Sequence, residues 1–78
     1  MIDYNKTMAE LVEKFGPVQG MHINAVVLPN IEKDFRSMLE SAPSFAKVKE
    51  EYIFDEKIGK ITLEGSNRKI TAVVVEKY

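Results

Sequence analysis

The chain has 78 residues, of which 45% are hydrophobic and 29% are charged, and its formal net charge at pH 7 is −1. This length allows one small domain, residues 1–78, with a single hydrophobic core, and the composition is that of an ordinary globular protein. The even mixture of charges gives little long-range attraction for phosphate backbones. The sequence contains no cysteine, which excludes disulfides, thiolate metal sites and a cysteine nucleophile.

The N-terminal segment and the hydropathy pattern predict where the protein resides. The first ten residues, MIDYNKTMAE, lack the basic stretch and following apolar run of a secretion signal. No stretch approaches the about 18 consecutive apolar residues of a transmembrane helix. We therefore expect a cytoplasmic protein that does not bind membranes.

The first predicted element is an amphipathic helix over residues 4–15, where apolar residues recur at helical spacing. Thr7 and Glu10 could form a capping box, which would start the helix later. Gly16 followed by Pro17 predicts its end, because glycine accepts positive φ and proline blocks continuation of the helix.

The next segment, residues 21–28, is rich in Ile and Val and predicts a strand that Pro29 ends. Asn30 can cap a second helix, which should end near Ala42 because Pro43 disfavours helical geometry at the preceding residue. The apolar face of this helix is formed by Ile31, Phe35, Met38 and Leu39.

Beyond Pro43 the apolar residues alternate with a period of two over three short segments, which are separated by the turn-prone sequences DEKIG and GSNR. Short connections between strands predict an antiparallel meander. The predicted fold class is α+β, a single small domain with element order α-β-α-β-β-β. It would combine a mixed or antiparallel four-stranded sheet with two amphipathic helices.

Two similar apolar phrases, INAVVL at 23–28 and ITAVVV at 70–75, fall in the first and last predicted strands. Side chains alternate between the two faces of a strand, so both strands would carry apolar groups on both faces. With both helices on the face of Ile23 and Ile70, solvent would meet four large apolar side chains. Covering them would contribute several kcal/mol at about 25 cal/mol per Å². These predicted partner-binding residues are Val26, Leu28, Val73 and Val75.

Two arrangements would cover this second face. One helix could lie on each side of the sheet, which gives three layers but divides a small core. Alternatively, another protein or a second copy of the chain could cover it, and a symmetric dimer is the commonest such assembly. We expect the second arrangement, in which a partner chain covers this face.

The order helix, strand, helix and three-stranded meander is similar to the central part of small dimeric scaffold domains of the roadblock type. The segment GKITLEGSNRKITAVVV resembles the closing hairpin of these domains. The resemblance is one of element order, and the extra strand before the second helix and the terminal helix of that family have no counterpart here.

The residues that could support catalysis are few. His22 is the only histidine, and the acidic pairs Glu50 with Glu51 and Asp55 with Glu56 are adjacent residues, which face opposite ways on a strand or are solvated in a turn. The four glycines match neither a phosphate loop nor a dinucleotide fingerprint. We expect no enzymatic activity, no catalytic or metal-binding residues and no cofactor.

The sequence thus predicts a non-catalytic protein–protein interaction module, an adaptor, regulator or inhibitor, that acts as a homodimer. The alternative is a single-stranded nucleic-acid-binding module, in which cations beside an aromatic side chain would combine charge with stacking. Solvated hairpin charges that deter edge pairing would explain the same residues. The residues of the alternative are Lys57, Lys60, Arg68, Lys69 and Tyr52.

Overall fold

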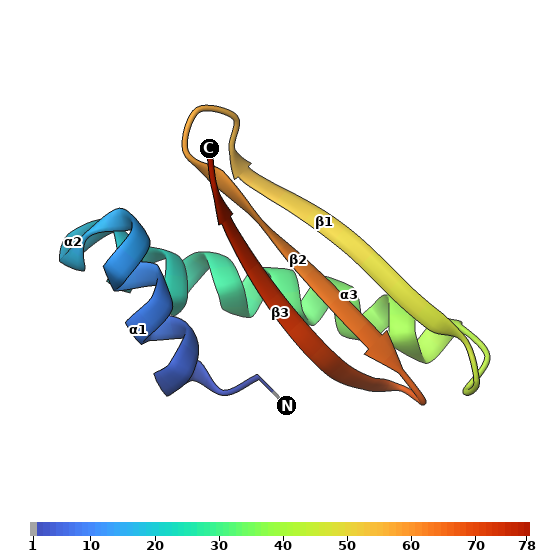
Figure 1. Ribbon diagram of the computed structural model, residues 1–78. Coiled ribbons are helices and arrows are strands. Elements are labelled where there is room, and N and C mark those ends of the chain that lie inside the picture. Colours follow the sequence, from blue (N-terminus) through green and yellow to red (C-terminus); the bar gives the residue numbers. More distant parts are fainter. Residues whose placement is uncertain (1) are drawn as a thin grey trace.

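The computed structural model describes residues 2–78 as two helical arms and one three-stranded sheet (Figure 1). The second arm runs without a break through two α-helical segments and a π-helical turn, η1. The sheet is an antiparallel meander in the order β1-β2-β3. The element bounds are α1 (Tyr4–Phe15), α2 (Pro17–His22), η1 (Ile23–Val27), α3 (Leu28–Ser41), β1 (Lys47–Asp55), β2 (Gly59–Ser66) and β3 (Lys69–Lys77).

Helix α1 confirms the helix predicted from apolar spacing, and its cap settles where it starts. The carboxylate of Asp3 accepts the backbone N–H groups of Asn5 and Lys6 at 3.1 and 3.2 Å. An aspartate at this position satisfies N–H groups that have no partner inside the helix. The helix therefore begins at Tyr4 and does not use Thr7 as its cap.

A sharp reversal joins α1 to α2. Gly16 has a φ of 89°, and Pro17 is the first residue of α2, where its missing N–H costs nothing. The two helices then pack closely at Gly20: a Cβ atom there would lie 2.6 Å from backbone atoms of Leu11 and Val12. Glycine at this position is what lets the two backbones approach.

The predicted strand over residues 21–28 is wrong, because these residues continue the second arm as a helix. The sheet therefore has three strands and not four, and the order α-β-α-β-β-β does not hold. The resemblance to roadblock-type domains depended on this strand and therefore does not hold. The segment forms a helix and not a strand because apolar residues at every fourth position continue the apolar face of α3. These residues are Ile23, Val27, Ile31, Phe35 and Leu39.

The π-helical turn η1 allows this arm to pass through a proline. The N–H of Leu28 donates to the carbonyl of Ile23, five residues back. Pro29 has no N–H, and in a regular α-helix its ring would clash with the carbonyl four residues earlier. The side chain of Asn30 also donates to the carbonyl of Val26 at 3.0 Å.

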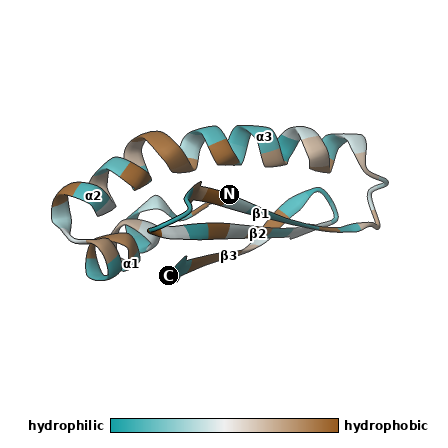
Figure 2. Ribbon diagram, turned by 90° about the horizontal axis from the view of Figure 1, so that it is seen from above, coloured by the Kyte–Doolittle hydropathy of each residue, from teal (hydrophilic) through white to brown (hydrophobic). Residues whose placement is uncertain are grey.

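The core lies between α3 and one face of the sheet, while α1 lies alongside β3 (Figures 1 and 2). Figure 2 shows α3 on one side of the strands and no helix over the other side. The three-layer arrangement is therefore not formed by residues 2–78. The buried apolar residues are Ile2, Leu11, Ile23, Leu28, Ile31, Phe35, Leu39, Ile61, Leu63 and Val75.

A β-bulge in β3 decides which of its side chains reach the core. Thr71 has no partner residue on β2, because the register shifts by one at this point. The inserted residue places Ile70 on the same face as Val73 and Val75, toward α3, while Ala72 faces the other way. The prediction that Ile70 faces the opposite way from Val73 and Val75 is therefore wrong.

Candidate functional site

The sheet has an open face, which we define as the side turned away from α3. Its side chains follow from the strand register and the alternation of side chains along each strand. The open face consists of Lys47, Lys49, Glu51 and Ile53 from β1, Lys60, Thr62, Glu64 and Ser66 from β2, and Lys69, Ala72, Val74 and Glu76 from β3.

Thr62 occupies the centre of the open face. It pairs with Glu51 on one side and Val74 on the other, and only 3% of its surface is exposed. Its hydroxyl oxygen is buried and has no hydrogen-bond partner among residues 2–78. Buried polar groups are nearly always paired, and an unpaired one costs about 1–3 kcal/mol. An acceptor brought from outside the chain would remove this cost.

The apolar side chains of the open face are few but exposed. Val74 is 40% exposed beside Thr62, and Ile53 is 57% exposed near the other end of the face. Ala72 lies between the charged ends and is half-buried. This face is amphipathic, unlike the opposite face, where the strands pack on α3.

The charges of the open face are separated by sign. Lys47, Lys49 and Lys69 lie toward the β2–β3 turn, which we call the lysine end, and Glu51 and Glu76 lie toward the other end. Each end also holds one charge of the opposite sign.

One ion pair joins two strands on the open face. The Nζ atom of Lys60 lies 2.9 Å from Oε1 of Glu51. This hydrogen bond lowers the pKa of Glu51 and raises the pKa of Lys60. Because the pair is at the surface, it contributes little to stability.

A hollow of about 520 Å³ lies at the lysine end of the open face. The side chains of Lys47, Lys49, Glu64 and Ser66 line it together with the bulge residue Thr71. It is an open depression that can receive a protruding side chain from a neighbouring molecule.

The predicted partner-binding residues do not lie together on one exposed face. Leu28 is fully buried, Val75 is 3% exposed in the core, and Val73 packs against the core. Val26 is 49% exposed, but it lies on η1 and not on the sheet. Val26 and Leu28 lie off the sheet because their segment is helical. Val73 and Val75 face the core together with Ile70 because of the bulge.

The residues predicted for nucleic-acid binding are also dispersed. Lys57 and Lys60 are near the β1–β2 turn, whereas Arg68 and Lys69 are at the β2–β3 turn, at the opposite end of the sheet (Figure 1). Tyr52 faces α3, where its hydroxyl donates to Asp34 at 2.7 Å. Burial and this hydrogen bond raise the pKa of Tyr52. The structure does not bring these cations together around an aromatic side chain.

Two further grooves flank the sheet. A groove of about 400 Å³ separates the start of α1 from β3, and one of about 430 Å³ lies between η1 and β1. Lys14 of α1 partly closes the β3 edge, because its Nζ donates to the carbonyl of Val75 at 2.7 Å. Among residues 2–78, no group of three or more histidine or acidic side chains is placed to hold a metal ion.

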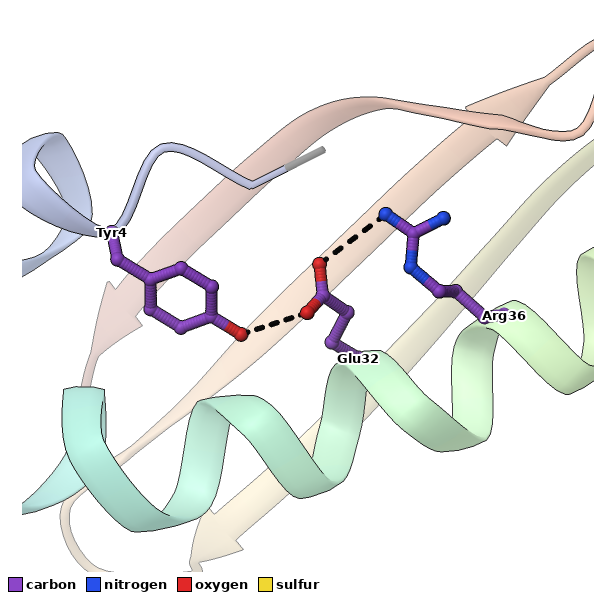
Figure 3. Close-up of polar contacts among 3 residues, drawn as sticks. All are labelled: Tyr4, Glu32 and Arg36. Carbon is purple, nitrogen blue, oxygen red and sulfur yellow. Dashed lines mark hydrogen bonds and ion pairs between the residues drawn. The ribbon is translucent and has the colours of Figure 1, made fainter.

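Polar contacts that the sequence did not reveal fix the start of α1 on the second arm. The Tyr4 hydroxyl donates to Glu32 of α3 at 2.9 Å, and Arg36 lies 3.5 Å from the other carboxylate oxygen (Figure 3). Behind this surface network, the hydroxyl of Thr7 donates to the side-chain oxygen of buried Asn24 at 2.6 Å. These contacts orient the two arms relative to each other.

The Tyr4 contact predicts a loss of stability in alkaline solution. Burial, together with the hydrogen bond to Glu32, raises the pKa of Tyr4 to about 12. Because the folded pKa exceeds the unfolded value near 10, this contribution is complete below about pH 10 and is lost as the pH rises through about 12. The free energy of unfolding, measured in urea, should therefore fall more for the parent than for Tyr4→Phe between about pH 9 and pH 11. An equal loss of stability in both proteins would contradict this role for Tyr4.

Comparison with known protein families, curated protein sequences and solved structures finds no match to this chain. Within residues 2–78, no helix combines the length and the apolar character needed to cross a lipid bilayer. The fold and the open face together define a thin two-layer α+β domain in which no helix of the described residues covers one sheet face.

Proposed function

We propose that this protein is a small interaction module that acts by protein–protein contact through the open face of its sheet. The observation that carries the proposal is Thr62, whose hydroxyl is buried at the centre of that face and finds no partner in the part of the chain that the structure describes. Side chains on a solvated sheet face ordinarily reach water, as antiparallel sheets allow. Thr62 does not, because its neighbours on β1 and β3 cover it, so a docked protein that moves these side chains aside could supply the acceptor that its hydroxyl needs.

The surroundings of Thr62 support contact rather than chemistry. Val74 and Ile53 present apolar surface, and charges at both ends of the face can orient a partner. The molecule extends only 16 Å in its shortest direction, so a partner on this face would add a second layer of packing to the sheet. The partner would occupy the surface opposite α3, and the module would recruit or mask the partner by this contact.

Site-specific photo-cross-linking in living cells tests the proposal. A photoreactive benzoylphenylalanine replaces Val74 on the open face, and a matched variant carries it at Lys33, which is exposed on α3. Irradiation should give discrete protein adducts from position 74 and none from position 33, because only the first lies at the proposed contact.

The mass of the adduct identifies the partner. An adduct with another protein, or with a second copy of the chain, supports the proposed function. Equal labelling from both positions, or no adduct from position 74, would reject it. Circular dichroism of both variants confirms that the comparison is between folded proteins.

A further inference from the structure

We infer that the occupant of the open face is a second copy of this chain, docked face to face about a two-fold axis. The inference rests on the proposed function and names its partner. The axis lies in the plane between the two sheets, crosses the strands at right angles and passes midway between Thr62 and Glu64. Each lysine end then lies over the opposite end of the second copy.

The separation of charges is the first argument for this arrangement. Such an axis reverses the strand direction, so Lys49 lies opposite Glu51 of the second copy. At the β3 side, Lys69 lies opposite Glu76 of the second copy. Symmetry repeats each pair, and complementary charges fix the register of an interface. A two-fold axis along the strands would instead place Lys47 over Lys69.

The unpartnered hydroxyl is the second argument. In the same register, Thr62 lies opposite Glu64 of the second copy, because the axis passes midway between these two positions on β2. The Thr62 hydroxyl is covered by its neighbours in the single chain, and it can donate to that carboxylate once docking moves these side chains aside. A hydrogen bond to a charged acceptor is among the stronger kinds. The dimer thus supplies an acceptor that the described residues of one copy do not provide.

The shape of the face agrees with this register. Ala72 lies opposite Val74 of the second copy, so the apolar side chains of the two copies contact each other next to the axis. Ile53, which is 57% exposed, lies opposite Lys47 of the second copy and therefore at the hollow of the lysine end. An exposed side chain and an open depression meet at both symmetric positions.

The size of the face predicts a weak dimer. Three strands about 4.8 Å apart, with about 3.3 Å per residue, give a face of roughly 30 by 15 Å. Two such faces bury about 1,000 Å² in total, which is near the lower limit for a specific interface. We expect dissociation in the micromolar to millimolar range, set by charge pairing more than by apolar area.

Analytical ultracentrifugation of the purified chain tests the inference. The parent should change from monomer to dimer between about 10 μM and 1 mM. Lys69→Glu and Glu76→Lys should each weaken dimerisation about tenfold or more, because each places like charges opposite each other at two symmetric positions. Lys33→Glu, which makes the same charge change on the exposed side of α3, should leave it unchanged.

Mixing the two single variants gives the sharpest outcome. Lys69→Glu and Glu76→Lys together restore both opposite-charge pairs, so they should form a mixed dimer when each alone is monomeric. A parent that remains monomeric at the highest concentration overturns the inference. Dimers that survive both charge changes overturn it as well. An adduct of Val74 with a different protein would then leave the proposed function standing, whereas no adduct would reject both.

Discussion

Replacing Phe35 with alanine should destabilise the folded chain by about 3–5 kcal/mol, the usual cost of removing a buried aromatic ring. Phe35 is fully buried in the middle of α3. Its ring lies against Gly65 of β2, where a Cβ atom would be only 3.2 Å away. The whole domain should have a stability of only roughly 4–12 kcal/mol, so the variant should lose a large share of it and should be largely unfolded if the parent lies at the low end of that range.

Urea unfolding followed by circular dichroism measures this loss. Ser37→Ala is the matched control, because Ser37 is exposed on the same helix and its change should stay within about 0.5 kcal/mol. A loss below about 1 kcal/mol for Phe35→Ala would mean that α3 is not held on the sheet by this ring. The open face would then lack the rigid backing that a binding surface requires.

Gly20→Ala should destabilise the protein by about 3 kcal/mol, although alanine is the better helix former by about 1 kcal/mol. A Cβ atom at this position would lie 2.6 Å from the backbone of Leu11 and Val12. Backbone atoms of a helix cannot move aside as a flexible side chain can, so α1 must shift as a whole. The contact of α1 with β3 through Lys14 should weaken with it.

The same unfolding measurement compares Gly20→Ala with Gln19→Ala, an exposed change in the same short helix. Gln19→Ala should be neutral or slightly stabilising, because it adds helix propensity without a contact. If Gly20→Ala were as stable as the control, the close approach of α1 and α2 would not be required by the fold.

Most of the fold could be predicted because its apolar periods are unambiguous. Helix α1, the part of α3 from Ile31 to Ser41 and the three-stranded meander follow from spacings of nearly four and of two, and their turns are marked by glycine and polar residues. The segment 21–28 failed because Ile and Val favour a strand locally, and Pro29 suggested a boundary. Tertiary packing along the face of α3 outweighed both signals.

The site was less predictable than the fold. A bulge such as that at Thr71 changes the face of every residue on one side of it, and nothing in the alternation of ITAVVV marks its position. One available signal for Thr62 was its place between Ile61 and Leu63 in the middle strand of a meander. A polar side chain on such a strand has neighbours on both sides, which is why it became buried.

The π-helical turn also fixes the direction of the first arm. A regular α-helix turns by about 100° per residue, so removing one residue from Ile23–Val27 would rotate α2 and α1 by about that angle around the axis of α3. Lys14 would leave the β3 edge, and Tyr4 would leave Glu32. The number of residues in this turn therefore fixes the orientation of about a quarter of the molecule. The turn should tolerate substitution of a residue far better than deletion of one.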